Sequence, residues 1–229
     1  MRKTIQFQSD AILKWSAFLF SFSFCLGLAV NSISFAMFVL VSFAITIKEI
    51  VSKEYKFSRS YLSIPILLFF SILFVRELLV DPQDAFGSFL ERNIAFLLLP
   101  LAIGLQADKI NKFLPLILKA FVYGCVFNLM INCFYAVYRG FIIHPDGINV
   151  WYFTYDFLAE PFGIQPIYLS FFYVFSLFIL YHFKDLFKNR LKLIFLIAIT
   201  LNVFLLAGRN AIVCMIVLTP IFLIVEKNF

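Results

Sequence analysis

Four arginines are the residues best suited to chemistry in a chain that is 63% hydrophobic and only 14% charged. They are Arg76, Arg92, Arg139 and Arg209, and each lies at the edge of an apolar run. A guanidinium group is planar and permanently charged, and its fork of N–H donors matches the oxygens of a phosphate or a carboxylate. The pattern therefore favours a site that binds an anionic group.

Each of these arginines also has a purely structural interpretation. Arg76 and Arg92 each stand beside a glutamate, so an ion pair could simply anchor a helix end at the membrane interface. Arg209 could be an interfacial anchor as well. An arginine at membrane depth is costly, however, which favours a functional role for Arg209.

The polar loop Tyr138–Pro161 contains Arg139, His144 and a cluster of aromatic residues. Aromatic rings suit either the bilayer interface or stacking against sugar rings. Of the two, we favour the interface. His144 fits a solvated turn as well as it fits a catalytic role.

Polar residues inside the apolar runs are few. Asn128 and Asn132 share one helical face at i, i+4 spacing, which predicts hydrogen bonds between helices. The four cysteines all lie in apolar runs, where we interpret them as small apolar fillers. The two histidines and the carboxylates show no ligand spacing, so neither a metal nor another cofactor is predicted.

The elements that position these residues are predicted to be membrane-spanning helices. A soluble domain is typically about a quarter charged, so 14% charge excludes that class. A crossing needs about 20 apolar residues. The fold class is therefore all-α, a polytopic bundle of about eight spans forming one transmembrane domain over 1–229. The predicted spans are 11–28, 31–47, 61–78, 93–106, 113–138, 163–183, 191–208 and 210–226.

The charges predict that the N-terminus lies in the cytoplasm. With that orientation, 15 of the 19 basic residues, including all twelve lysines, fall in cytoplasmic segments. The other side keeps the four arginines named above against seven acidic residues. Cytoplasmic loops of membrane proteins are enriched in basic residues, so the net charge of +6 needs no nucleic-acid partner.

Two segments have a distinctive sequence. The first reads Glu-Pro-Phe-Gly-Ile-Gln-Pro-Ile-Tyr-Leu-Ser over 160–170 and is followed by two apolar runs and Ala-Gly-Arg-Asn at 207–210. It resembles the O-antigen ligase and O-antigen polymerase-like membrane family, which has a Gly-Ile-His-Pro-x-Tyr-Leu-Ser stretch and a later span that ends in a Ser-Arg-type motif. The second, at 90–100, resembles the family's short span with an acidic-basic start and a closing proline. The resemblance covers about 60–225.

The resemblance implies a GT-C-type O-antigen ligase fold in the bacterial inner (plasma) membrane. Such proteins move a glycan from undecaprenyl diphosphate to a glycan or lipid acceptor on the periplasmic face, in lipopolysaccharide and other cell-surface polysaccharide biosynthesis. Arg209 matches the span-end arginine that faces the carrier diphosphate, so it is the predicted catalytic residue. Gln165 stands where the family usually has histidine, and an amide cannot titrate. The predicted substrate-binding residues are Arg76, Arg92, Arg139, Gln165 and Tyr168.

Two alternative functions are compatible with the sequence. A transporter or permease subunit usually shows repeated halves or helices broken by glycine and proline, and this chain has only eight glycines. The other alternative is a truncated, noncatalytic membrane protein. The chain ends at Phe229, before the large periplasmic loop of the family, so we expect it to correspond to the N-terminal part of such a protein. Ligase and polymerase activity are not distinguished.

Overall fold

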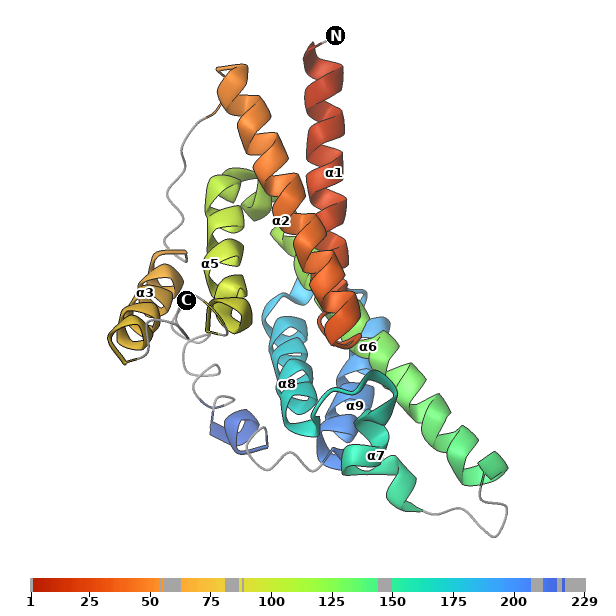
Figure 1. Cartoon of the computed structure of the whole chain (residues 1–229). Helices are drawn as coiled ribbons and strands as arrows, with labels where there is room; N and C mark the ends of the chain where they lie inside the picture. Colours follow the sequence, from red (N-terminus) through yellow and green to blue (C-terminus); the bar gives the residue numbers. More distant parts are fainter. Residues whose placement is uncertain are drawn as a thin grey trace. The chain divides into compact units, whose positions relative to one another are not determined.

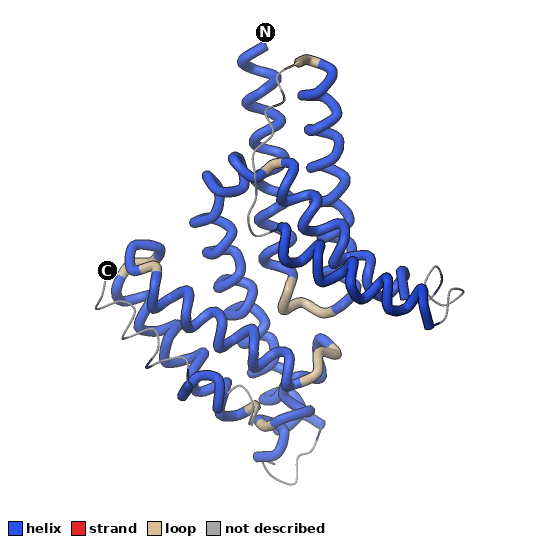
Figure 2. Tube along the Cα trace, turned by 90° about the vertical axis from the view of Figure 1, so that its left-hand side faces the viewer, coloured by secondary structure: helices blue, strands red, loops and turns tan. Residues whose placement is uncertain are grey.

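The computed structural model describes residues 2–53, 55, 63–80, 87, 89–143, 150–206, 212–217 and 220. Within these residues every regular element is helical and none is a strand, as Figures 1 and 2 show. The all-α fold class is therefore confirmed. The chain divides into two compact units, residues 1–17 with 33–114 and residues 18–32 with 115–229. The boundaries fall within three helices, α1 (Arg2–Ser23), α2 (Leu28–Val51) and α6 (Ala107–Tyr138).

The first unit contains helices that pack through aromatic side chains. Its elements are most of α1 (Arg2–Ser23) and α2 (Leu28–Val51), then α3 (Ser63–Val80), α5 (Leu90–Leu105) and the start of α6 (Ala107–Tyr138). Phe69 of α3 meets Phe96 of α5 edge to face, with 6.4 Å between ring centroids. An apolar cavity of about 370 Å³ lies beside this pair, with prolines from both helices in its wall.

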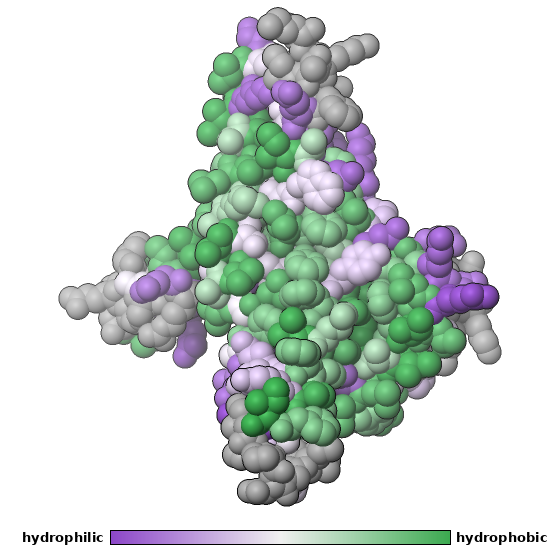
Figure 3. Space-filling model, turned by 90° about the vertical axis from the view of Figure 1, so that its right-hand side faces the viewer, coloured by the Kyte–Doolittle hydropathy of each residue, from purple (hydrophilic) through white to green (hydrophobic). Residues whose placement is uncertain are grey.

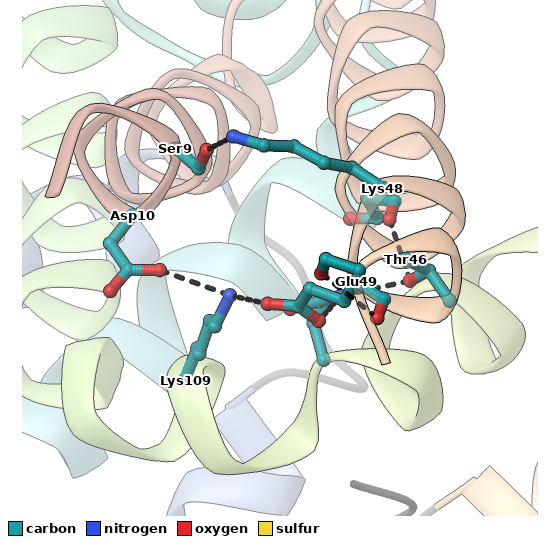
Figure 4. A network of polar contacts seen from close by, with 9 residues as sticks. Ser9, Asp10, Thr46, Lys48, Glu49 and Lys109 are labelled. Carbon is teal, nitrogen blue, oxygen red and sulfur yellow. Dashed lines mark hydrogen bonds and ion pairs between the residues drawn. The ribbon is translucent and has the colours of Figure 1, made fainter. Parts of the chain in front are cut away.

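An ion-pair network ties three helices of the first unit together (Figure 4). The ammonium group of Lys109 lies 3.0 Å from the Asp10 carboxylate and also donates to Glu49. Gln106 donates to the hydroxyl of Thr46 at 2.8 Å. The partial burial of Tyr55, together with the nearby Glu49 carboxylate, raises the pKa of the tyrosine phenol. The network thus links the first half of α1 and the end of α2 to the start of α6.

The second unit consists of a helical core and a group of short helices. Leu169, Tyr173 and Leu180 of α8 are buried in the core, and α8 packs against α9. The elements after α6 are the π-helix η2 (Arg139–Ile143), the 3-10 helix η3 (Val150–Phe153), α7 (Tyr155–Ala159), the 3-10 helix η4 (Glu160–Phe162), α8 (Pro166–His182), the 3-10 helix η5 (Lys184–Leu186) and α9 (Asn189–Leu205).

Two glycines permit close approaches within the second unit. A Cβ atom on Gly124 of α6 would collide with the carbonyl oxygen of Phe22 at the end of α1. Gly27, in the turn between α1 and α2, has a φ of 88°, and a Cβ there would lie 2.7 Å from the carbonyl oxygen of Phe162. Only glycine fits both positions without a shift of the neighbouring backbone.

The expected number of eight spans is wrong for the described part of the chain. Helices do lie over seven of the eight predicted ranges, and most of 210–226 falls outside the described residues. Among the described residues, however, only Leu28–Val51 and Ala107–Ile142 are long and apolar enough to cross a membrane alone. Counting the bent pair Tyr155–Phe162 and Pro166–His182 as one span gives three.

Helix length and charge explain the difference. The helices α5, α8 and α9 have 16, 17 and 17 residues. At about 1.5 Å per residue they reach about 24–26 Å, less than a hydrocarbon core of about 30 Å. The α1 helix is longer but carries charged residues along its first half. Hydrophobic side chains nevertheless cover much of the face drawn in Figure 3. An apolar surface of this extent is typical of a membrane protein.

Candidate functional site

A sharp bend between η4 and α8 creates the candidate site. The helical segments Tyr155–Phe162 and Pro166–His182 meet at 83°. Gly163 ends η4 in the left-handed conformation, with φ 60°, and its N–H donates to the Glu160 carbonyl at 3.0 Å. Pro166 then starts α8, where its missing N–H costs nothing, and it holds the preceding Gln165 in an extended conformation, with ψ 133°. The sequence Gly-Ile-Gln-Pro thus encodes the bend.

A cavity of about 400 Å³ lies at this bend, within the second unit. Four of its wall residues are polar or charged, and they come from η2, α7, η4 and the residue before α8. The lining residues are Arg139, Asp156, Phe157, Ala159, Glu160, Gly163, Ile164, Gln165 and Pro166. The cavity therefore combines one cation, two carboxylates, an amide and an aromatic ring.

Arg139 is held by an ion pair and by aromatic rings. Its Nη1 donates to Oε2 of Glu160. The guanidinium carbon lies 5.5 Å from the centroid of Tyr135, 5.6 Å from that of Tyr152 and 6.0 Å from that of Phe157. Guanidinium groups are attracted to aromatic faces at such distances. The positive charge of Arg139 is therefore already engaged before any ligand arrives.

Asp156 and Gln165 present polar atoms that no other described residue uses. Within the part of the chain that the structure describes, neither side chain has an ion-pair or hydrogen-bond partner. Asp156 offers two carboxylate oxygens, and Gln165 offers one carbonyl oxygen and an NH₂ group. Both side chains are exposed, so a ligand in the cavity can reach them.

The structure brings together two of the six predicted site residues. Arg139 and Gln165 line the same cavity. Tyr168, one turn into α8, is 59% exposed and does not line it. Arg76 is exposed on α3 in the first unit, and Arg92 is in α5 of that unit, with its side chain outside the described residues.

Other predicted positions cannot be placed. The predicted catalytic Arg209 lies outside the described residues, and so does His144. The catalytic assignment of Arg209 consequently stays a prediction.

Asp156, Phe157 and Glu160 are site residues that the sequence analysis did not select. The sequence does contain a signal for the two acidic residues. Asp156 and Glu160 stand four residues apart, the spacing that puts two side chains on one helical face. Phe157 meets Tyr152 edge to face, with 5.5 Å between centroids. The aromatic cluster of this loop therefore lies against the cavity, where stacking on a sugar ring is feasible.

A buried hydrogen-bond network joins α6 and α8 in the core of the second unit. Oδ1 of Asn128 accepts hydrogen bonds from the Tyr173 hydroxyl at 2.7 Å and from Asn132 Nδ2 at 2.8 Å. Asn128 Nδ2 donates to the carbonyl oxygen of Cys25. The predicted bonding of Asn128 between helices is thus confirmed, with Tyr173 of α8 as the partner on one side. The thiols of Cys25 and Cys125 are buried, with 3.4 Å between their sulfur atoms.

The described residues contain no group of three His, Cys, Asp or Glu side chains that could hold a metal ion. Comparison with known protein families, with curated proteins and with solved structures finds no significant match to the chain.

Proposed function

We propose that the chain is an O-antigen ligase-like membrane protein that transfers a glycan from undecaprenyl diphosphate to an acceptor at the periplasmic face of the bacterial inner membrane. One observation carries this proposal. The segment 160–170, on which the family resemblance rests, supplies five of the nine residues that line the 400 Å³ cavity. A family-like motif that forms the wall of a polar and aromatic cavity favours a binding role over a purely structural one.

The composition of the cavity supports a sugar as its ligand. Sugar hydroxyl groups donate hydrogen bonds well, and Asp156, Glu160 and Gln165 offer acceptor oxygens on one side of the cavity. The Phe157 ring adds an apolar surface for the C–H face of a pyranose. A bare diphosphate fits this cavity less well, because Arg139 is already paired with Glu160.

The transfer itself needs no further reactant. An acceptor hydroxyl oxygen forms a bond to the anomeric carbon of the glycan, and the bond from that carbon to the phosphate oxygen breaks. The hydroxyl proton ends on the departing diphosphate, which leaves as undecaprenyl diphosphate. In this scheme Arg209 offsets the charge that develops on the diphosphate, and the cavity positions the sugar.

The charge distribution supports the orientation that this function requires. Basic residues concentrate in cytoplasmic segments when the N-terminus lies inside. This orientation places the loop that contains Asp156 and Glu160 at the periplasm, where the acceptor is, and it requires α1, α3 and α5 to cross the membrane as well as α2 and α6. The basic segment from Lys184 to Lys192 at the other end of α8 faces the cytoplasm.

A transfer assay tests the proposal. Membranes that contain the chain are incubated with undecaprenyl-diphosphate-linked radiolabelled glycan, and the release of glycan from the carrier to membrane acceptors is measured. The Arg209→Lys variant should transfer about tenfold more slowly or worse, because a point charge replaces a bidentate fork. Arg190→Lys, a matched change in a cytoplasmic segment, should not alter the rate. A wild-type rate for Arg209→Lys rejects the catalytic assignment, and uptake of glycan into liposomes without transfer would favour a transporter.

A further inference from the structure

The cavity has spare hydrogen-bond acceptors. Both carboxylate oxygens of Asp156 are unpaired within the described part of the chain, and so is the carbonyl oxygen of the Gln165 side chain. Oε2 of Glu160 accepts from Arg139, which leaves Oε1. On the donor side, the Gln165 amide is uncommitted, and Arg139 keeps N–H groups besides the one that donates to Glu160. The uncommitted oxygens suit a ligand that donates several hydrogen bonds.

The formal charge of the cavity favours a ligand with a cationic group. Asp156 and Glu160 contribute two negative charges and Arg139 one positive charge, so the lining carries a net charge of −1. Because Glu160 and Arg139 form an ion pair, the unbalanced charge belongs to Asp156. A cationic group on the ligand would neutralise it, whereas a carboxylate or a phosphate would be repelled.

We infer that the cavity binds a sugar that carries an ammonium group, with that group paired to Asp156. The inference rests on the proposed function for the premise that the ligand is a glycan, and it specifies the class of sugar. Hydroxyl groups donate to Gln165 and to the free oxygen of Glu160, and the ring lies against Phe157. Neutral sugars bind more weakly than amino sugars, and uronic acids bind most weakly.

Equilibrium binding of three trisaccharides tests the inference. The chain is purified in a detergent without a sugar head group, because a maltoside would compete for the cavity. It is titrated by calorimetry with trimers of glucosamine, of N-acetylglucosamine and of galacturonic acid at neutral pH. An exposed ion pair contributes up to about 1 kcal/mol, or about fivefold in affinity, so the glucosamine trimer should bind up to about fivefold more tightly than its N-acetylated form.

A pair of isosteric variants assigns the preference to one side chain. Asp156→Asn keeps the shape and removes the charge, so the glucosamine trimer should bind it no more tightly than the N-acetylglucosamine trimer. Asp185→Asn is the matched control, because Asp185 is also an exposed carboxylate of the second unit but does not line the cavity. This variant should keep the full preference.

The outcomes separate this inference from the proposed function. Equal affinity for the two glucosamine-based trimers, or a preference that survives in Asp156→Asn, overturns the role of the ammonium group and leaves the glycan site standing. Failure of every trimer to bind contradicts the glycan site and with it the proposed function. Tightest binding of the galacturonic acid trimer would also overturn the inference, since it would show that Arg139 and not Asp156 sets the selectivity.

Discussion

Replacing Tyr173 by phenylalanine should destabilise the second unit by about 1 kcal/mol. The hydroxyl group donates to Oδ1 of Asn128 at 2.7 Å, and both side chains are fully buried. A hydrogen bond contributes about 0.5–1.5 kcal/mol net in water-soluble proteins and about 0.6 kcal/mol on average between membrane helices. The substitution leaves Asn128 Oδ1 with its second donor, Asn132, so no buried acceptor is left without a partner.

Removal of the other partner of this hydrogen bond, by Asn128→Ala, should lower the free energy of unfolding by more, about 3 kcal/mol. It removes the partner of the Tyr173 hydroxyl, of Asn132 Nδ2 and of the Cys25 carbonyl oxygen at once. Each buried polar group without a partner costs about 1–3 kcal/mol, although neighbouring losses do not add fully. The double variant with Tyr173→Phe should therefore show a coupling free energy of about 1 kcal/mol.

Unfolding of the purified protein in mixed micelles, with increasing dodecyl sulfate and circular dichroism as the signal, measures these free energies. Tyr168→Phe is the matched control, because Tyr168 lies on the same helix but is 59% exposed. Its loss of stability should be close to zero. Equal destabilisation by Tyr173→Phe and Tyr168→Phe would refute the argument that the buried network holds α6 and α8 together.

Three further predictions follow from the packing, the ion pairs and the topology. Gly124→Ala should lower the free energy of unfolding by about 1–3 kcal/mol in the same assay, because its Cβ would meet the backbone at the end of α1. Lys109→Met should destabilise the first unit by about 1 kcal/mol or more through the loss of two ion pairs, and Lys112→Met, an exposed position on the same helix, should not. In spheroplasts, a membrane-impermeant maleimide should label a cysteine at Asp156 but not one at Asp185, since α8 separates the two positions.

Each of these three predictions would be contradicted by a specific result. Wild-type stability of Gly124→Ala would show that α1 and α6 do not approach as closely as the structure has them. Equal stability of the Lys109 and Lys112 variants would mean that the ion pairs contribute nothing measurable. Labelling of both cysteines from the same side would contradict the proposed topology, in which the chain crosses the membrane between Asp156 and Asp185.

The helices were predictable from the sequence because the signal is strong and local. Apolar runs of 17 residues or more favour helices wherever they occur, and the ranges of α2, α5, α6 and α8 agree with the predicted ones to within several residues. The number of crossings was less predictable. An apolar run does not reveal that α9 has only 17 residues in helical conformation, nor that α7 and α8 meet at a sharp angle.

The candidate site was predicted only in part, and for a physical reason. Arg139 and Gln165 were selected for their residue type and their place in a motif, which are visible in the sequence. The pairing of Arg139 with Glu160 joins residues 21 positions apart in the sequence, and no local pattern encodes that contact. Residue type favoured Arg139 as a phosphate ligand, whereas its ion pair with Glu160 favours a positioning role in the proposed sugar site.

One titration decides whether the cavity takes the sugar part of the carrier lipid. Native mass spectrometry of the purified chain would compare undecaprenyl diphosphate with and without a linked oligosaccharide, for the wild type and for Gln165→Ala. The glycan-linked carrier should bind more tightly, and removal of one hydrogen-bonding side chain should reduce that advantage by about threefold to tenfold. Equal binding of the two carriers, or an advantage unchanged in Gln165→Ala, would contradict a glycan site at this bend.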